Sequence, residues 1–119
     1  MAVHRELGFG FLESVFHRAL EIELAANGVA FESEKRIDVF YRSRPVGFFV
    51  ADLVIEGKLV VELKAVESMA KAHEVQLVNY LTAAEIDDGL LINFGTESLQ
   101  FRRKFKRRTS ASIQTDSSS

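Results

Sequence analysis

The sequence predicts a single α/β domain with a mixed central sheet flanked by helices, in the order helix, three strands, helix, and one or two strands. Two patterns of apolar residues support this class. In two segments they recur at helical spacing, and in several others they form the short runs typical of strands. A length of 119 residues fits one domain and leaves no room for a second. The apolar share of 47% and the charged share of 27% exclude collagen-like, coiled-coil and wholly disordered chains.

The first predicted helix covers residues 11 to 26, with Gly8-Phe9-Gly10 leading into it and Asn27-Gly28 as a typical helix stop. The second covers residues 67 to 84. Its expected packing positions share helical spacing: Met69, Ala72, Val75, Leu77, Val78 and Leu81.

Three strands are expected between the helices, at residues 35 to 42, 48 to 55 and 59 to 66. Arg44 to Gly47 and Glu56-Gly57-Lys58 are predicted turns, so the last two of these strands form an antiparallel hairpin. Residues 89 to 94 predict a short buried strand after the second helix, and residues 99 to 105 a final basic strand. The connection through the second helix is long enough for a right-handed parallel crossover.

The domain is expected to span residues 1 to 108, followed by a disordered polar tail, TSASIQTDSSS, at 109 to 119. The absence of cysteine excludes disulfides and thiolate metal sites, so a reducing, cytoplasmic location is expected. No apolar stretch reaches the length of a membrane helix, and the start lacks the apolar core of a signal peptide. No membrane partner and no export are therefore expected.

The net charge of −2 is unevenly distributed. Six of the 15 basic residues lie close together: Arg102, Arg103, Lys104, Lys106, Arg107 and Arg108. The remaining 9 basic residues face 17 acidic residues, which leaves the rest of the chain at −8. This asymmetry fits contact with a polyanion near the C-terminus, and the alternative is a solvated basic segment.

Charged residues interrupt one face of the predicted hairpin. The odd positions from Phe49 to Ala65 are apolar and are expected to be core, whereas the even face carries Asp52, Glu62 and Lys64. If the turn is centred on Gly57, opposed residue numbers sum to 114, which pairs Asp52 with Glu62 at a Cβ separation of about 4.5 to 5.5 Å. Two carboxylates at that distance repel unless one is protonated or a cation lies between them.

A divalent metal would remove this repulsion. Oxygen ligands without cysteine or paired histidines favour Mg²⁺ or Mn²⁺ over zinc. Lys64 lies two residues beyond Glu62 on the same face, where its ammonium could hold an attacking water or a phosphate oxygen. The alternative is an internal ion pair between Lys64 and either carboxylate.

The second helix carries a polar stripe, with His73, Gln76 and Tyr80 at positions i, i+3 and i+7. An amide and a phenol can orient water and phosphate, and the alternative is that these three residues serve packing or lie on the surface. Glu13 opens the first helix, where the helix dipole alone favours a carboxylate. His17 has no partner at ligand spacing, so no role is assigned to it.

Several stretches resemble one family. The run Gly10 to Phe16, GFLESVF, resembles the signature of the bacterial GxxExxY proteins. The stretches VADLVIEGKLVVELKAV, AHEVQLVNYL and GLLINF resemble the remainder of that family's pattern, and the resemblance covers about residues 3 to 101. The family belongs to the PD-(D/E)XK nuclease-like superfamily, so the resemblance implies a restriction-endonuclease-like core.

The resemblance also implies roles for individual residues. The metal ligands would be Asp52, Glu62, the Leu63 backbone carbonyl and Glu13. Lys64 would position the nucleophilic water, and Gln76 and Tyr80 resemble the Gln-x-x-x-Tyr element of several exonuclease-like branches. The chain departs from the family in carrying Phe16 where the signature has tyrosine, and in having little helix before VHRELG, so a partner chain could supply missing packing.

The expected function is Mg²⁺-dependent (or Mn²⁺-dependent) hydrolysis of phosphodiester bonds in nucleic acid, with DNA as the expected substrate. The expected catalytic residues are Asp52, Glu62, Lys64, Glu13 and Gln76, and Tyr80 and the basic residues 102 to 108 would contact nucleic acid. Three alternatives remain: a nuclease fold that binds nucleic acid without cleavage, an interaction module that binds a partner or a second copy, and a hydrolase of small phosphate esters.

Overall fold

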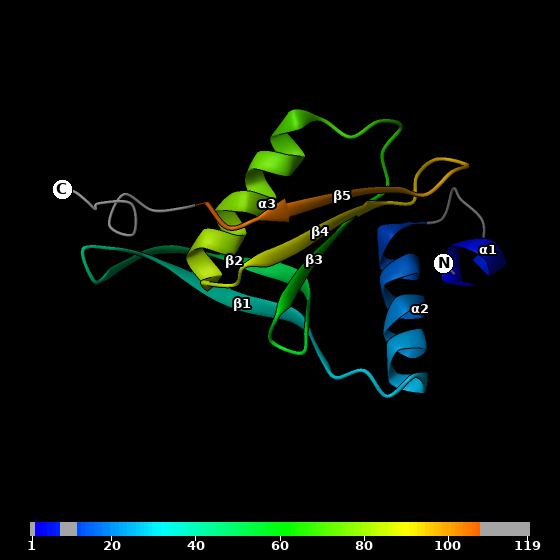
Figure 1. Cartoon of the computed structure of the whole chain (residues 1–119), viewed down its shortest axis with the longest axis horizontal. Helices are drawn as coiled ribbons and strands as arrows, with labels where there is room; N and C mark the ends of the chain where they lie inside the picture. Colours follow the sequence, from blue (N-terminus) through cyan, green and yellow to red (C-terminus); the bar gives the residue numbers. More distant parts are fainter. Residues whose placement is uncertain (1, 8–11, 108–119) are drawn as a thin grey trace.

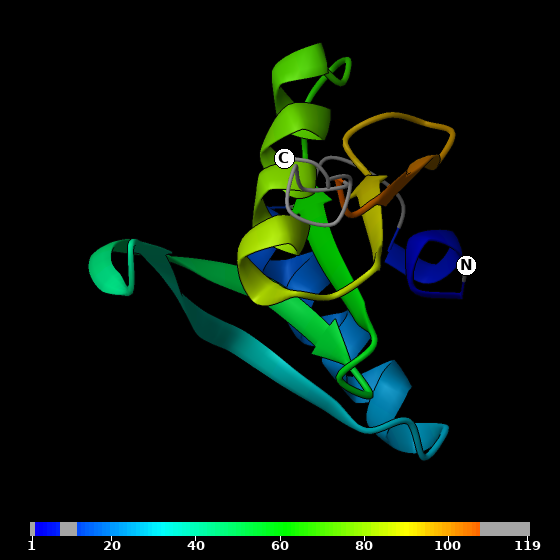
Figure 2. The ribbon, with the colours of Figure 1, turned by 60° about the vertical axis from the view of Figure 1, so that its left-hand side comes forward.

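The computed structural model describes residues 2 to 7 and 12 to 107, in which five strands form one sheet in the order β1-β2-β3-β4-β5. The strands are β1 (Phe31–Tyr41), β2 (Arg44–Ile55), β3 (Leu59–Lys64), β4 (Asp88–Asn93) and β5 (Gln100–Phe105). The helices are α1 (Ala2–Leu7), α2 (Glu13–Ala26) and α3 (Lys71–Ala84). Helices α2 and α3 lie on opposite faces of the sheet (Figures 1 and 2).

The sheet is mixed, as predicted. Strands β3 and β4 are parallel and are connected through α3, whereas the β1–β2, β2–β3 and β4–β5 pairs are antiparallel. The short helix α1 was not predicted. None of the described helices has the length and apolarity needed to cross a membrane. Gly8 to Phe11, Arg108 and the predicted tail 109 to 119 lie outside the described residues.

Apolar clusters lie on both faces of the sheet, in line with the predicted helices on its two sides. One cluster lies beneath α1 and α2 and comprises Val3, Phe16, Leu20, Leu53, Val61, Leu63, Ile92 and Phe94. The other lies beneath α3 and comprises Ile37, Ala51, Val54, Val60, Leu77, Leu81 and Leu91. Val54 and Val60 of the even face are thus buried beneath α3, and the prediction was wrong for the side of Ala51, which lies toward α3 and not on the face of Leu53.

The first hairpin turn lies earlier than predicted. Arg42 and Ser43 form a two-residue turn with φ values of 51° and 64°, and Tyr41 pairs with Arg44. Turns of this kind require two residues at positive φ and usually contain Asn-Gly or Asp-Gly, so Arg-Ser provided no turn signal. The predicted turn at Arg44 to Gly47 is instead the first part of β2.

The observed end of α2 agrees with the prediction from the sequence, whereas α3 agrees only in part. Gly28 follows α2 with φ of 70°, which confirms the predicted stop, because glycine adopts this conformation without strain. Helix α3 begins at Lys71 instead of residue 67. Ala72 and Val75 are exposed, contrary to the expected packing, whereas Leu77 and Leu81 are buried as predicted.

The side chain of Asn93 fixes the chain immediately after β3. Its amide group donates to the Val66 carbonyl at 2.9 Å and to the Gln100 side chain at 2.8 Å. Its oxygen accepts the N–H groups of Val66 at 3.0 Å and Gly95 at 3.1 Å. Asn93 is fully buried, so this extended segment replaces the first turn predicted for the second helix.

We predict that Gly95→Ala destabilises the protein by about 2 kcal/mol or more, since a Cβ at this position would lie 2.5 Å from the Val66 nitrogen and 2.7 Å from the Ala65 carbonyl carbon. Gly47→Ala is the matched control, because a Cβ there has no atom within 4 Å. Urea denaturation would measure both variants. Equal stabilities of the two would contradict the tight approach at Gly95.

Candidate functional site

The candidate site lies where β2 and β3 separate. Their ladder contains three pairs, Leu53↔Val61, Val54↔Val60 and Ile55↔Leu59. These numbers sum to 114, which confirms the predicted register and makes Asp52 and Glu62 the next opposed residues. Beyond this point β2 remains paired with β1 and β3 with β4.

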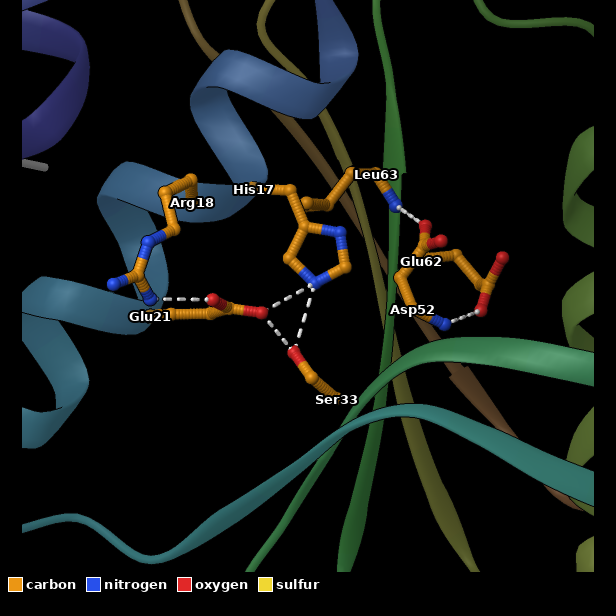
Figure 3. A network of polar contacts seen from close by, with 7 residues as sticks. All are labelled: His17, Arg18, Glu21, Ser33, Asp52, Glu62 and Leu63. Atoms are coloured by element: carbon orange, nitrogen blue, oxygen red, sulfur yellow. Dashed lines mark hydrogen bonds and ion pairs between the residues drawn. The ribbon is translucent and has the colours of Figure 1, made fainter.

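The two carboxylates replace the backbone hydrogen bonds that the ladder no longer makes. Glu62 accepts the Asp52 backbone N–H at its Oε2 over 2.9 Å, and Asp52 accepts the Leu63 N–H at its Oδ2 over 2.7 Å. Figure 3 shows these two contacts crossing between the strands. Glu62 is buried and Asp52 is half-buried, so the site opens to solvent from the Asp52 side.

The regular geometry of β1 also changes here. Glu34 has φ of 50° and lies between the regular pairs Ser33↔Leu53 and Lys35↔Ala51. An L-residue rarely adopts positive φ, so the backbone of β1 is irregular opposite Asp52.

Burial, and then the negative charge of Asp52, raise the pKa of the Glu62 carboxyl to about 8, and the positive charge of Lys64 opposes this shift. The pKa of Glu13 is also raised, first by burial and then by Asp52, while Lys64 lowers it. Burial and the charges of Glu62 and Asp52 raise the pKa of Tyr80. The groups from α2, β2, β3 and α3 therefore lie within electrostatic reach of one another.

No three His, Cys, Asp or Glu side chains within the described residues form a ready group of metal ligands. The donor chemistry nevertheless fits a hard divalent cation, because it consists of carboxylate oxygens. One oxygen of Asp52 and one of Glu62 are held by backbone N–H groups, and the second oxygen of each makes no hydrogen bond to a described residue. A cation beside them would offset the repulsion that raises the pKa of Glu62.

The other predicted residues have different surroundings. Lys64 is half-buried and forms no salt bridge with any described carboxylate, so the internal ion pair considered for it is not formed. Tyr80 stacks on Phe49 with ring centroids 3.6 Å apart, and Gln76 is exposed. His73 caps α3, because its Nδ1 accepts the Ala70 N–H at 3.1 Å.

The basic C-terminal strand is partly neutralised within the fold, because three carboxylates pair with four of the five described basic residues. Lys104 lies 3.1 Å and Arg102 3.8 Å from Glu74 of α3. The other pairs are Arg103–Asp88 at 3.2 Å, Lys106–Asp87 at 3.7 Å and the hydrogen bond from Arg107 to Asn79 at 3.3 Å. These contacts weaken the expectation that residues 102 to 107 offer free charge to a polyanion.

Sequence reasoning missed a polar cluster centred on His17. Its Nε2 lies 3.1 Å from the Ser33 hydroxyl and 3.3 Å from Glu21, and Arg18 binds Glu21 at 2.9 Å (Figure 3). The four-residue spacing of His17 and Glu21 on one helix was a sequence signal for their contact. The contact with Ser33 depends on the packing of β1 against α2 and had no such signal. Serine and glutamate meet the same ring nitrogen, so this is not the relay of a Ser-His-acid triad, which uses both nitrogens. The cluster joins α2 to β1.

Phe16, which stands where the GxxExxY signature that the sequence resembles has tyrosine, is core. It is 1% exposed, and its ring stacks on Phe94 with centroids 3.9 Å apart. The position therefore contributes packing between α2 and the segment after β4 instead of a polar group.

Comparison with known proteins identifies the class. A model of the PD-(D/E)XK nuclease superfamily matches residues 1–107, so the chain belongs to that superfamily. No curated protein matches the chain.

Two solved structures share the fold, and they confirm the predicted restriction-endonuclease-like core. The structure of SSO0001 is 21% identical with a TM-score of 0.65, covering 84% of this chain and 52% of that one. An alkaline exonuclease (LHK-Exo) from Laribacter hongkongensis is 8% identical with a TM-score of 0.54, covering 76% of this chain and 54% of that one. The chain thus spans about half the length of either protein.

We predict that Glu62→Gln stabilises the protein most strongly at high pH. The folded-state pKa is raised, so stability is lost as pH rises from about 4.5, where the carboxyl of the unfolded chain ionises, to about 8, where the buried carboxyl ionises as well. The variant should gain on the order of 3 kcal/mol at pH 9 and little at pH 4. Denaturation at both pH values without added metal would measure this, with exposed Glu97→Gln as the control. An equal gain at both pH values would rule out the ionisation of Glu62 as its cause.

Proposed function

We propose that this chain is a Mg²⁺-dependent or Mn²⁺-dependent nuclease that hydrolyses phosphodiester bonds of nucleic acid, with DNA as the substrate. The observation that carries this proposal is the placement of Asp52 and Glu62 at the end of the β2–β3 ladder, with Lys64 two residues beyond Glu62 and without a salt bridge to any described carboxylate. Membership of the PD-(D/E)XK nuclease superfamily supports it, as does the fold shared with an alkaline exonuclease. Within that superfamily we propose the GxxExxY family, and one nuclease-like domain at residues 1 to 108.

Asp52 and Glu62 would hold the metal, with the Leu63 carbonyl and Glu13 as further oxygen ligands. The bound metal would supply charge to polarise the scissile phosphate and acidify a water. Lys64 would hold that water and stabilise negative charge on the phosphate, for which its freedom from a carboxylate partner is favourable. Gln76 would orient water or phosphate from the exposed side of α3, and Tyr80 would contact nucleic acid.

A second candidate is a module that keeps the fold and binds nucleic acid or a protein without cleavage. The observation that favours it is that backbone N–H groups already hold one oxygen of each carboxylate, without three acidic or histidine ligands gathered among the described residues. This module would show binding that is indifferent to Mg²⁺. The two candidates therefore differ in product formation as well as in metal dependence.

We predict that the protein cleaves linear or circular DNA with Mg²⁺ or Mn²⁺ and that chelation stops cleavage. Lys64→Ala should lower the rate by about 100-fold or more, because it removes a charge that acts on the developing anion. Gel analysis of labelled DNA, with RNA in parallel, would measure this. Lys58→Ala in the β2–β3 turn is a matched control, since it removes the same charge from an exposed position.

Full activity in Lys64→Ala would remove the mechanistic role proposed for this lysine. Wild-type protein that is folded and binds DNA but forms no product with either metal would favour the non-cleaving module. Circular dichroism of each variant would separate loss of chemistry from loss of the fold.

A further inference from the structure

The distal part of the first hairpin, residues 36 to 50, projects from the body of the protein and is called the β1–β2 arm below. In Figure 1 it extends beyond α3 at the left of the view, and Figure 2 shows the same projection from another side. Its apolar and aromatic side chains are unusually exposed for such a small domain: Phe40 61%, Tyr41 62%, Val46 63%, Phe48 56% and Val50 45%. The proposed chemistry at Asp52 and Glu62 does not use them.

The two faces of the arm differ. Ile37 and Phe49 form a cross-strand pair on the face toward α3, where Ile37 is buried and Phe49 stacks on Tyr80. Side chains alternate along a strand, so the neighbouring pairs Arg36↔Val50 and Asp38↔Phe48 point to the opposite face. No described helix packs against this face, and its side chains are exposed.

Positive charge accompanies the exposed aromatic rings. The Arg36 guanidinium lies 3.9 Å from the Phe48 ring centroid, and the Arg42 guanidinium lies 5.3 Å from that of Tyr41. Three arginines against Asp38 give the arm a charge of +2. Arg36 is paired with Asp38 at 3.1 Å, whereas Arg42 and Arg44 at the tip form no salt bridge with any described residue.

We infer that the exposed face and tip of the β1–β2 arm bind single-stranded nucleic acid. Unpaired bases would stack on Phe48 and Tyr41, since every base presents a flat face to an aromatic ring. Arg42 and Arg44 would contact the phosphates. An apolar protein partner fits less well, because it would remove these arginines from water without supplying a counter-charge.

The inference rests on the proposed nuclease function and names its substrate class. The arm leads directly to the candidate site, because Asp52 is two residues beyond Val50 on the same strand. Phe48 is about 13 Å from Asp52 along β2, at the usual rise of a strand. A strand of nucleic acid lying on the arm would therefore reach the carboxylates.

Binding would be measured by fluorescence anisotropy in chelator, with a labelled 20-nucleotide DNA strand, the RNA of the same sequence, and the DNA duplex. Tyr41→Ala/Phe48→Ala and Arg42→Ala/Arg44→Ala should each weaken single-strand binding by about 10-fold or more. The arginine variant should also reduce the slope of log Kd against log salt by about 1.4. Arg102→Ala/Arg103→Ala on β5 tests the competing basic surface and should change Kd by less than about 3-fold, because Glu74 and Asp88 lie against these side chains.

Unchanged affinity in both arm variants, a loss confined to the β5 variant, or preference for the duplex would overturn the inference. The inference would also be overturned if the wild-type protein were a dimer, the arm variants were monomers, and their affinity for nucleic acid were unchanged. The arm would then bind a second copy of the protein. All substituted side chains are exposed, and thermal denaturation would confirm folding. If the wild-type protein cleaves nucleic acid but the arm variants bind it normally, only the proposed role of the arm is refuted. If binding depends on the arm but no cleavage occurs, only the proposed nuclease activity is refuted.

Discussion

The short β2–β3 ladder is the constraint on which the rest of the structure depends. After three residue pairs the strands separate, and the carboxylates of Asp52 and Glu62 accept the backbone N–H groups of Asp52 and Leu63. A buried N–H without an acceptor is costly, so these side chains stabilise the separation that places them together. Beyond it β2 continues into the arm and β3 into the centre of the sheet. One local arrangement thus determines both the site and the projecting hairpin.

The same arrangement opposes its own stability at neutral pH. Glu62 must be buried to reach the Asp52 N–H, and burial beside a second carboxylate raises its pKa to about 8. This cost is borne in a fold with apolar clusters on both sides of the sheet, and burial of apolar surface is the main source of folding stability. A carboxyl held at such a cost is typical of functional positions, although structural networks can also perturb a pKa.

Much of the fold followed from periodicity, whereas the failures occurred where tertiary structure overrides local signals. The register of Asp52 opposite Glu62 was predictable, because the Gly57 turn and the two apolar runs leave one alignment. The Arg42-Ser43 turn was not predictable, because neither residue is a usual choice for a two-residue turn in which both residues have positive φ. The chain before α3 is bound at Val66 by Asn93, which is distant in sequence, so this contact could not be predicted from local signals. The meeting of carboxylates was therefore predictable, but their hydrogen bonds to the backbone were not.

The distribution of charge shows why a count of basic residues is a poor guide to a binding surface. The six basic residues after Phe101 are the densest run in the sequence, yet in the described part Glu74, Asp87 and Asp88 pair with four of them. These acids come from α3, from the start of β4 and from the residue before it, so no window of sequence shows the neutralisation. Arg42 and Arg44 are only two residues, but they lie at the tip of a hairpin and form no salt bridge with any described residue. The packing of the elements thus determines which basic side chains are paired with acids. A phosphate is attracted by the electrostatic field that remains after these ion pairs have formed.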